Sequence, residues 1–388
     1  MRDRADQTYV GLYPLRVVLV RPAAPTPLPD RNLDLMRAIA VLAVLVSHLV
    51  KVFGVRDPRL NAMGNLGVVL FFVHTALVLM ASLERLEGPL QGWALARTFY
   101  VRREFRIYPL AWATIALYLL FNFPTSSTPW AAQDLHLVHT PATILTNLLL
   151  IQNLAGRENV SEVLWTLPLE VQMYALLPGC YLLMRAGRLR ALVLAIAAAM
   201  GAGLLVYFWT QPGSELHGVW RLTIFEYVPC FLGGVLAYYL LRFGSRQPKF
   251  PAWTWLPLLL SWGAVTILFV HNSRANPPRG WPFALGVGCL IPLVQNRAPD
   301  WGARAGELIA RYSYGIYLLH MPAMTVGFQW GRSLPLAAQW GVFLTLVVAG
   351  PVAAYHLIEA PGIALGRRMS QPPGSHRPLG TESISGVP

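Results

Sequence analysis

The chain has 388 residues, of which 55% are hydrophobic and 13% are charged, and its formal net charge at pH 7 is +13. A water-soluble domain carries about 25% charged residues, so this composition excludes an ordinary cytosolic enzyme, a disordered chain and a coiled coil. The excess of Lys and Arg is typical of membrane proteins with basic cytoplasmic loops, and it does not by itself indicate nucleic-acid binding. The sequence therefore predicts an all-α, polytopic membrane protein.

About ten apolar segments are long enough to cross a bilayer as helices, which takes about 20 residues each. These segments are 33–53, 64–82, 107–124, 164–184, 190–209, 221–241, 254–271, 281–296, 309–330 and 336–357. A shorter apolar stretch, Ile144–Leu154, is interrupted by Asn residues and is predicted to be re-entrant or interfacial. Long continuous apolar runs exclude a transmembrane β-barrel, whose strands alternate between apolar and polar residues.

Lys and Arg are unequally distributed between alternate loops. The loops on the side of the two termini contain 23 of the 31 basic residues, so the positive-inside rule predicts that both termini are cytoplasmic. We expect a basic, Pro-containing arm over residues 1–30, a transmembrane domain over 31–361 and a disordered cytoplasmic tail over 362–388. The three Cys residues lie in apolar stretches without metal-ligand spacing, so no metal is expected.

The first predicted span carries three ionisable residues on one helical face. Arg37 and His48 are 11 residues apart, which returns to within about 20° of the same face, and Asp34 lies one turn before Arg37. Ionisable residues inside a span cost about 2.5–3.5 kcal/mol each by insertion scales, so they indicate function by default. The alternative is structural, with Arg37 paired to Asp34 and His48 packed in a hydrogen bond.

Basic and aromatic residues gather where the third predicted span begins. They are Arg102, Arg103, Arg106 and Tyr108, and Pro109 follows them. Guanidinium groups bind phosphates through paired N–H donors, so this cluster is compatible with a nucleotide-like ligand at the cytoplasmic face. The other interpretation is that these charges only set the topology.

The fourth predicted span contains Glu170 and Tyr174 in an otherwise apolar helix, where an unpaired carboxylate is costly. Glu170 and His48 are predicted to lie at matched depths of about 8–9 Å from the outer surface. A carboxylate beside a histidine is a common way to orient a general base. His320, in the ninth span, lies near the middle of the bilayer and by itself favours a structural role.

Taken together, these segments resemble the acyltransferase-3 family of bacterial integral-membrane O-acyltransferases. The similar motifs are Arg37 to His48 with Asp34, Arg103-Glu-Phe-Arg106-Ile-Tyr-Pro, Trp165-Thr-Leu-Pro-Leu-Glu170-Val-Gln-Met-Tyr174, Ser313-Tyr-Gly-Ile-Tyr317-Leu-Leu-His320 and Glu359-Ala-Pro361. They follow the family order over about residues 31–361. One departure lies in the second span, where the family's Ser-Gly is replaced by Thr75-Ala76 and an unusual intramembrane His74 precedes it.

The resemblance implies transfer of an acyl group, commonly acetyl, from cytoplasmic acyl-CoA to a hydroxyl of a sugar or glycan at the bacterial inner membrane. On this hypothesis His48 is the general base and Glu170 orients it, while Tyr174 or His320 donates to the thioester oxygen. The residues expected to bind the coenzyme are Arg37, Arg102, Arg103, Arg106 and Tyr108, with its phosphates at the four arginines. The residues expected to support the site are Asp34, Trp165 and Glu359.

The expected partners are a carbohydrate or glycoside acceptor and the lipid bilayer, with no nucleic acid, and a homo-oligomer stays open. The main alternative is a proton-coupled transporter or flippase of a glycan or lipid-linked precursor, in which His48, Glu170 and Glu226 form a path. A scaffold for a glycan machine is a third interpretation, but it leaves the intramembrane charges unexplained. Release of label from acyl-CoA would separate the enzyme from both alternatives.

Overall fold

The computed structural model describes ten stretches of the chain. They are residues 30–55, 57–87, 90, 92–125, 140–187, 189–209, 223–244, 250–269, 277–294 and 300–370. Within these residues the protein is all-helical, apart from one isolated bridge between Phe250 and Val294. The predicted arm 1–30 lies outside the described residues except for its last position.

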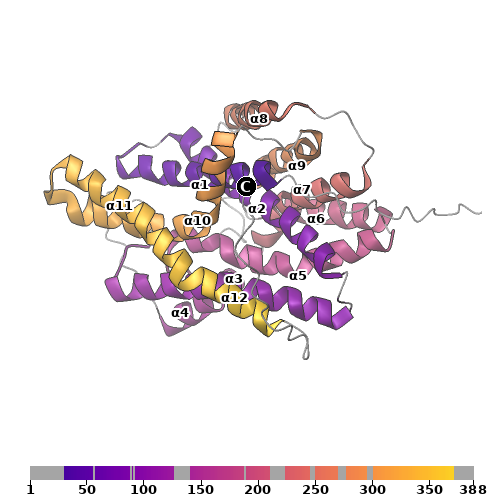
Figure 1. The fold of residues 1–388 in the computed structure, drawn as a ribbon, viewed down its shortest axis with the longest axis horizontal. Coiled ribbons are helices and arrows are strands. Elements are labelled where there is room, and N and C mark those ends of the chain that lie inside the picture. The colour runs from indigo at the N-terminus through magenta and orange to yellow at the C-terminus, as the bar shows by residue number, and fades with distance from the viewer. Residues whose placement is uncertain are drawn as a thin grey trace, which may run out of the picture.

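The helices of the described residues form one bundle (Figure 1). In chain order they are α1 (Asp30–Val52), α2 (Pro58–Glu87), α3 (Gly92–Phe121), α4 (Pro141–Leu148), α5 (Thr166–Arg185), α6 (Leu189–Trp209), α7 (Thr223–Phe243), α8 (Trp255–Phe269), α9 (Pro277–Leu293), α10 (Asp300–Met324), α11 (Leu336–Ala354) and α12 (Ala360–Met369). A 3₁₀ turn, Glu162–Trp165, leads into α5. Two π-helical turns, Thr325–Gln329 and Tyr355–Glu359, follow α10 and α11.

A helix overlaps each of the ten predicted spans. Five helical segments in the described part of the chain are long and apolar enough to cross a membrane, namely Arg31–Val52, Pro58–Glu87, Glu162–Arg185, Ile224–Phe243 and Leu336–Met369. Shorter apolar helices lie in α6, α8 and α9. The protein is therefore a multi-pass helical membrane protein, while the number of about ten spans and the side of the termini stay predictions.

Two boundaries differ from those expected from the sequence. The third span was expected to begin at 107 after a loop, whereas α3 begins at Gly92, so that its arginines lie inside the helix. The tail was expected to be disordered from 362, whereas residues 360–369 form α12. Gly362 and Gly366 of α12 pack against Phe105 of α3, and this packing explains why a short, weakly apolar segment stays helical. Residues 371–388 lie outside the described part of the chain.

Helix α2 is the centre of the bundle, in contact with α1, α3, α5, α7, α8 and α9. Glycines allow its neighbours to approach closely, as expected for helices packed in lipid. A Cβ at Gly67 would lie 2.6 Å from the Ala40 carbonyl oxygen of α1, and a Cβ at Gly234 of α7 would collide with the Val73 carbonyl oxygen of α2. These contacts fix the position of α2 against the helices on both sides of it.

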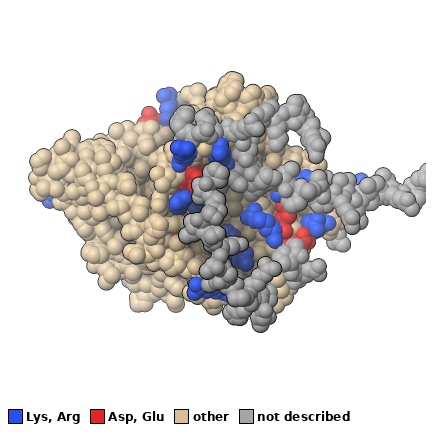
Figure 2. Space-filling model, viewed as in Figure 1, with Lys and Arg blue, Asp and Glu red and all other residues tan. Residues whose placement is uncertain are grey.

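The outer surface of α11 is apolar. Leu336, Leu344 and Val348 are all more than half exposed, and Figure 2 shows a broad area with very few charged residues on the side of the molecule where Figure 1 places α11. Exposed apolar residues on a long helix are expected where lipid replaces water. Helix α1 packs against α2 and α10, and this arrangement brings the ionisable residues of α1 into the interior.

Candidate functional site

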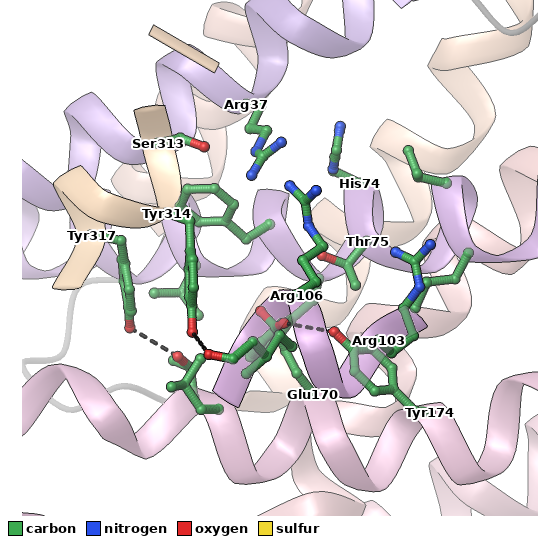
Figure 3. A pocket seen from close by; sticks show the side chains of 18 of the residues that line it. Arg37, His74, Thr75, Arg103, Arg106, Glu170, Tyr174, Ser313, Tyr314 and Tyr317 are labelled. Atoms are coloured by element: carbon green, nitrogen blue, oxygen red, sulfur yellow. Dashed lines mark hydrogen bonds between the residues drawn. The ribbon is translucent and has the colours of Figure 1, made fainter. Parts of the chain in front are cut away.

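A cavity of about 450 Å³ lies among α1, α2, α3, α5 and α10 (Figure 3). Three arginines line it, Arg37 of α1 and Arg103 and Arg106 of α3. We call it the arginine cavity. The other polar residues that line it are Asp34, His74, Thr75, Thr166, Glu170, Tyr174, Ser313, Tyr314 and Tyr317. Its three arginines outnumber its two carboxylates, Asp34 and Glu170, so the cavity is suited to an anionic group.

The charged side chains of the arginine cavity are connected to carboxylates and hydroxyls. Arg106 lies 3.5 Å from Glu359 Oε1, and the Glu359 side chain is only 1% exposed. Glu170 accepts a 3.3 Å hydrogen bond from the Tyr174 hydroxyl. Arg103 Nη2 lies 3.4 Å from the Ser82 hydroxyl. These contacts hold the side chains in fixed positions around the cavity, as Figure 3 shows for Glu170 and Tyr174.

A second cavity of about 390 Å³ adjoins the first and shares Asp34, Arg37 and Arg106 with it. Arg311 and Arg367 also line this side cavity. The arginines of the two cavities therefore form one basic region around the N-terminal half of α1. An extended ligand with several phosphate groups would contact both parts.

A third cavity, of about 260 Å³, contains His48 and is called the histidine cavity. Its other polar lining residues are Ser47, Lys51, Asn61, Asn65, Glu162, Trp165 and Tyr317. It lies toward the other end of α1, because His48 is 11 residues, or about 17 Å, beyond Arg37 along the helix. One helix therefore contributes the arginine of one cavity and the histidine of another.

His48, which lines the histidine cavity, forms a pair with His320, which is not among the residues that line it. His48 Nδ1 lies 3.3 Å from His320 Nε2 and 3.0 Å from the Val44 carbonyl oxygen. His320 Nδ1 lies 3.0 Å from the Ile316 carbonyl oxygen. A carbonyl oxygen only accepts, so Nδ1 of each ring carries the hydrogen. In the neutral pair the single hydrogen on His48 Nδ1 is shared between the Val44 carbonyl oxygen and His320 Nε2, and His48 Nε2 keeps a lone pair.

Glu170 does not contact His48, in contrast to the arrangement expected from the sequence. Glu170 lines the arginine cavity and bonds to Tyr174, whereas His48 lines the histidine cavity and bonds to His320. A matched predicted depth on two helices does not fix the direction in which their side chains point. The partners that orient His48 are the Val44 carbonyl oxygen and His320.

Of the other residues singled out in the sequence, some line the cavities and some do not. Trp165 lines the histidine cavity, and Asp34 lines the arginine and side cavities. Arg102 instead bonds to the Ser370 hydroxyl at 2.9 Å. The Tyr108 hydroxyl donates to the Leu149 carbonyl oxygen, beyond α4. Arg102 and Tyr108 therefore lie outside the lining of these cavities and connect α3 to neighbouring segments.

Several lining residues were not assigned a role from the sequence. Asn61 and Asn65 lie one turn apart near the start of α2, and the start of the predicted span at residue 64 falls between them. Their spacing of four residues was the available signal, but it is meaningful only once the helix is known to begin at Pro58. His74 was noted as unusual, and its ring lies beside Arg37 and Arg106 (Figure 3). Among the described residues, no group of three or more His, Cys, Asp and Glu is arranged to hold a metal ion.

Comparisons with known proteins match nearly the whole described region. The family model of an acyltransferase domain, the acyltransferase-3 family, matches residues 30–356. The chain is also 24% identical over 358 residues to Nodulation protein 10 of Rhizobium leguminosarum bv. viciae, an alignment that covers 86% of this chain and 93% of that protein. No solved structure matches the chain significantly.

Proposed function

The chain belongs to the acyltransferase-3 family, and from this premise we propose that it moves an acyl group, acetyl in the first instance, from cytoplasmic acyl-CoA to a hydroxyl of a sugar or glycan at the bacterial inner membrane. The observation that carries the proposal is the His48–His320 pair at a polar cavity. Because His48 Nδ1 lies beside the Val44 carbonyl oxygen, we infer that Nδ1 carries the hydrogen and that Nε2 keeps the lone pair. Membership of the family makes the protein an acyltransferase and disfavours the transporter and scaffold interpretations.

The donor is assigned to the arginine cavity. Coenzyme A carries several phosphate groups, and guanidinium forks are well suited to bind them. Arg37, Arg103 and Arg106 are the residues assigned to this role. Arg311 and Arg367 in the side cavity extend the basic surface for the nucleotide part. The thioester arm then runs along α1 toward His48.

The acceptor is assigned to the histidine cavity. His48 Nε2 removes the proton from the acceptor hydroxyl as its oxygen attacks the thioester carbonyl carbon. The carbon–sulfur bond then breaks, and the proton passes from the histidine to the departing thiolate of coenzyme A. An acyl-histidine intermediate that later transfers its acyl group to the hydroxyl is the alternative order of the same bond changes.

His320 is assigned a positioning role instead of donation to the thioester oxygen. Its Nδ1–H is used on the Ile316 carbonyl oxygen and its Nε2 accepts from His48, so the neutral ring has no hydrogen left for the substrate. Tyr174 bonds to Glu170 in the other cavity. Glu170 is accordingly reassigned from orienting His48 to balancing the charge of the arginines.

The glycan class of the acceptor rests on the family resemblance, since the relative's printed name, Nodulation protein 10, names a process and no acceptor. The histidine cavity adds support, because amide, hydroxyl and indole groups around it provide both donors and acceptors for sugar hydroxyls.

The test is transfer of label from [acetyl-¹⁴C]acetyl-CoA by purified full-length protein in proteoliposomes that contain a glycolipid extract of the host membrane. Wild-type protein is expected to transfer label and release coenzyme A thiol, and His48→Ala should reduce the rate by about 10²–10⁴-fold, the usual contribution of a general base. His356→Ala, at an exposed histidine bonded to Tyr312, is the matched control and should retain the wild-type rate.

His320→Ala should lower kcat and alter its pH profile more than it alters KM for the donor, because it disturbs the orientation of the base without touching the donor. Wild-type turnover by His48→Ala protein would exclude the general-base assignment. Glycan uptake into vesicles without thiol release would instead support a transporter.

A further inference from the structure

The arginine and histidine cavities meet at two side chains. Val68 of α2 and Tyr317 of α10 are the residues that line both cavities in the described part of the chain. Val68 is 6% exposed and Tyr317 is 7% exposed, so each fills the space between the cavities instead of leaving it open. We call this pair the constriction.

Tyr317 is held in the constriction by contacts from both sides. Its hydroxyl donates to the Val163 carbonyl oxygen at 3.0 Å and accepts from the Thr166 hydroxyl at 3.0 Å. Its ring lies edge-on to Phe71, with centroids 5.9 Å apart, and 6.3 Å from the His320 ring. Figure 3 shows the Tyr317 side chain at the margin of the arginine cavity. The ring therefore has a fixed position between the arginines and the histidine pair.

This position matters because the proposed reaction needs both cavities at once. The phosphates of the donor are assigned to the arginines and the acceptor hydroxyl to His48, so the thioester carbonyl and the acyl group have to lie at the constriction, between the two cavities. Protein interiors are packed closely enough that even one added methylene is felt where side chains cannot move. The constriction is a place of this kind, because the Tyr317 ring is held in position and Val68 is β-branched and therefore has few rotamers.

We propose that Val68 and Tyr317 select the acyl group by its size, admitting acetyl and disfavouring longer chains. The inference rests on the proposed acyl-CoA-dependent function. It assigns selection of the acyl chain length to two residues that act by their shape and not by charge or proton transfer. The ring of Tyr317 acts as the barrier, and its hydroxyl holds the ring in place. Val68 forms the opposite side, where a larger side chain would narrow the passage.

The experiment measures binding of S-alkyl thioethers of coenzyme A, which the enzyme cannot cleave and which need no acceptor. Purified full-length protein is titrated with the S-ethyl, S-butyl and S-hexyl compounds, and with adenosine 3′,5′-bisphosphate as a probe of the arginine cavity alone. Wild-type affinity is expected to fall from S-ethyl to S-hexyl while the nucleotide probe binds throughout.

Val68→Ala and Tyr317→Ala should reverse this trend, with about a fourfold gain in affinity for each methylene newly accommodated. Tyr317→Phe should keep the wild-type order, because the ring is retained. Val68→Phe should weaken S-ethyl binding and leave the nucleotide probe unaffected. Val69→Ala removes the same atoms one residue along α2, at a buried side chain that faces Gly280 of α9, and should keep the wild-type order.

The outcomes are distinguishable. If wild-type protein binds neither the thioethers nor the nucleotide probe, the proposed donor site is wrong and this inference falls with it. If the nucleotide probe binds but wild-type and folded Val68→Ala protein show the same order of affinities, the constriction does not select and only this inference is overturned. An equal gain in Val69→Ala would likewise overturn it, because general loosening of α2 would then explain the effect. Val68→Ala provides the answer even if Tyr317→Ala fails to fold.

Discussion

In the described part of the chain, a carbonyl oxygen and a second imidazole are the hydrogen-bond partners of His48, and Glu162 is the carboxylate that lines the same cavity. His320 and the Val44 carbonyl oxygen accept from His48 Nδ1, and this leaves Nε2 available as a base. A carboxylate in contact with His48 would bury a charge that needs pairing and hydrogen bonds to offset its desolvation. A neutral second imidazole gives the same directional hydrogen bond at a lower cost. The carboxylate at Glu170 lies instead where arginines balance its charge.

Arg106 connects ligand binding to stability through its ion pair with the buried Glu359. Arg106→Ala should lower the thermal midpoint, because it leaves Glu359 buried without its cation, a change that costs about 3–5 kcal/mol. It should also weaken acetyl-CoA binding by roughly ten- to hundredfold, the equivalent of one charge-assisted hydrogen bond of about 1.5–3 kcal/mol. Arg106→Lys should recover only part of the affinity, since an ammonium lacks the bidentate fork.

The double variant Arg106→Ala with Glu359→Gln separates the two effects. It should regain most of the thermal stability while acetyl-CoA affinity stays low, as measured by thermal melts and by titration of folded protein. Arg332→Ala, at an exposed arginine outside the lining of the arginine and side cavities, serves as control and should change neither quantity. Recovery of donor affinity in the double variant would show that Arg106 acts only through stability.

At the scale of helices, glycines set how closely α2 and its neighbours pack. Gly234 of α7 faces the Val73 carbonyl oxygen and Ala76 of α2, and Gly233 faces Ala284 of α9. Contacts of this kind replace the hydrophobic driving force that is missing between helices in lipid. They also fix the rotation of α2, and therefore the direction in which Val68 and His74 point.

Gly234→Ala should destabilise the protein and reduce the yield of folded material. The added methyl meets backbone atoms of α2, which cannot move aside as a side chain can, and overpacking of this kind costs about 1–3 kcal/mol or more. Gly201→Ala in α6 is the matched control, because a Cβ there meets nothing within 4 Å, and it should be neutral or slightly stabilising. Thermal melts of the two purified variants make the comparison. Equal midpoints would exclude tight α2–α7 packing at this position.

At the scale of the whole molecule, the distribution of basic residues predicts which cavity faces the cytoplasm. With 23 of the 31 Lys and Arg on the side of the termini, both termini are predicted to be cytoplasmic. The arginine cavity then faces the cytoplasm, where acyl-CoA is available, and the histidine cavity lies toward the opposite face.

A reporter enzyme that is active only in the periplasm, fused after Pro388, should therefore give no signal in intact cells. The same reporter fused after Arg332, in the turn between α10 and α11, should be active and controls for expression. A strong signal from the Pro388 fusion would reverse the assignment of donor and acceptor sides. It would leave the geometry of the two cavities unchanged.

The sequence by itself determined the helical membrane architecture and the family, and it singled out several residues that line the candidate cavities, among them Arg37, His48 and Arg106. Apolar runs long enough to cross a bilayer are sufficient to predict the helical membrane architecture. The order of several motifs along the chain is sufficient to predict the family. The common face of Arg37 and His48 also followed from the sequence alone, because the period of a helix is fixed by its backbone hydrogen bonds. The early start of α3 and the helix α12 did not, because they depend on packing between segments far apart in the chain.

Only the tertiary structure decided which side chains meet. His48 and His320 are separated by 272 residues, and Glu170 was expected to fill the place that His320 occupies. Helical periodicity relates residues within one helix, but the rotation of one helix against another depends on which glycines and small residues allow close approach. That rotation directs Glu170 to the arginines, His320 to His48, and Val68 and Tyr317 to the boundary between the two cavities.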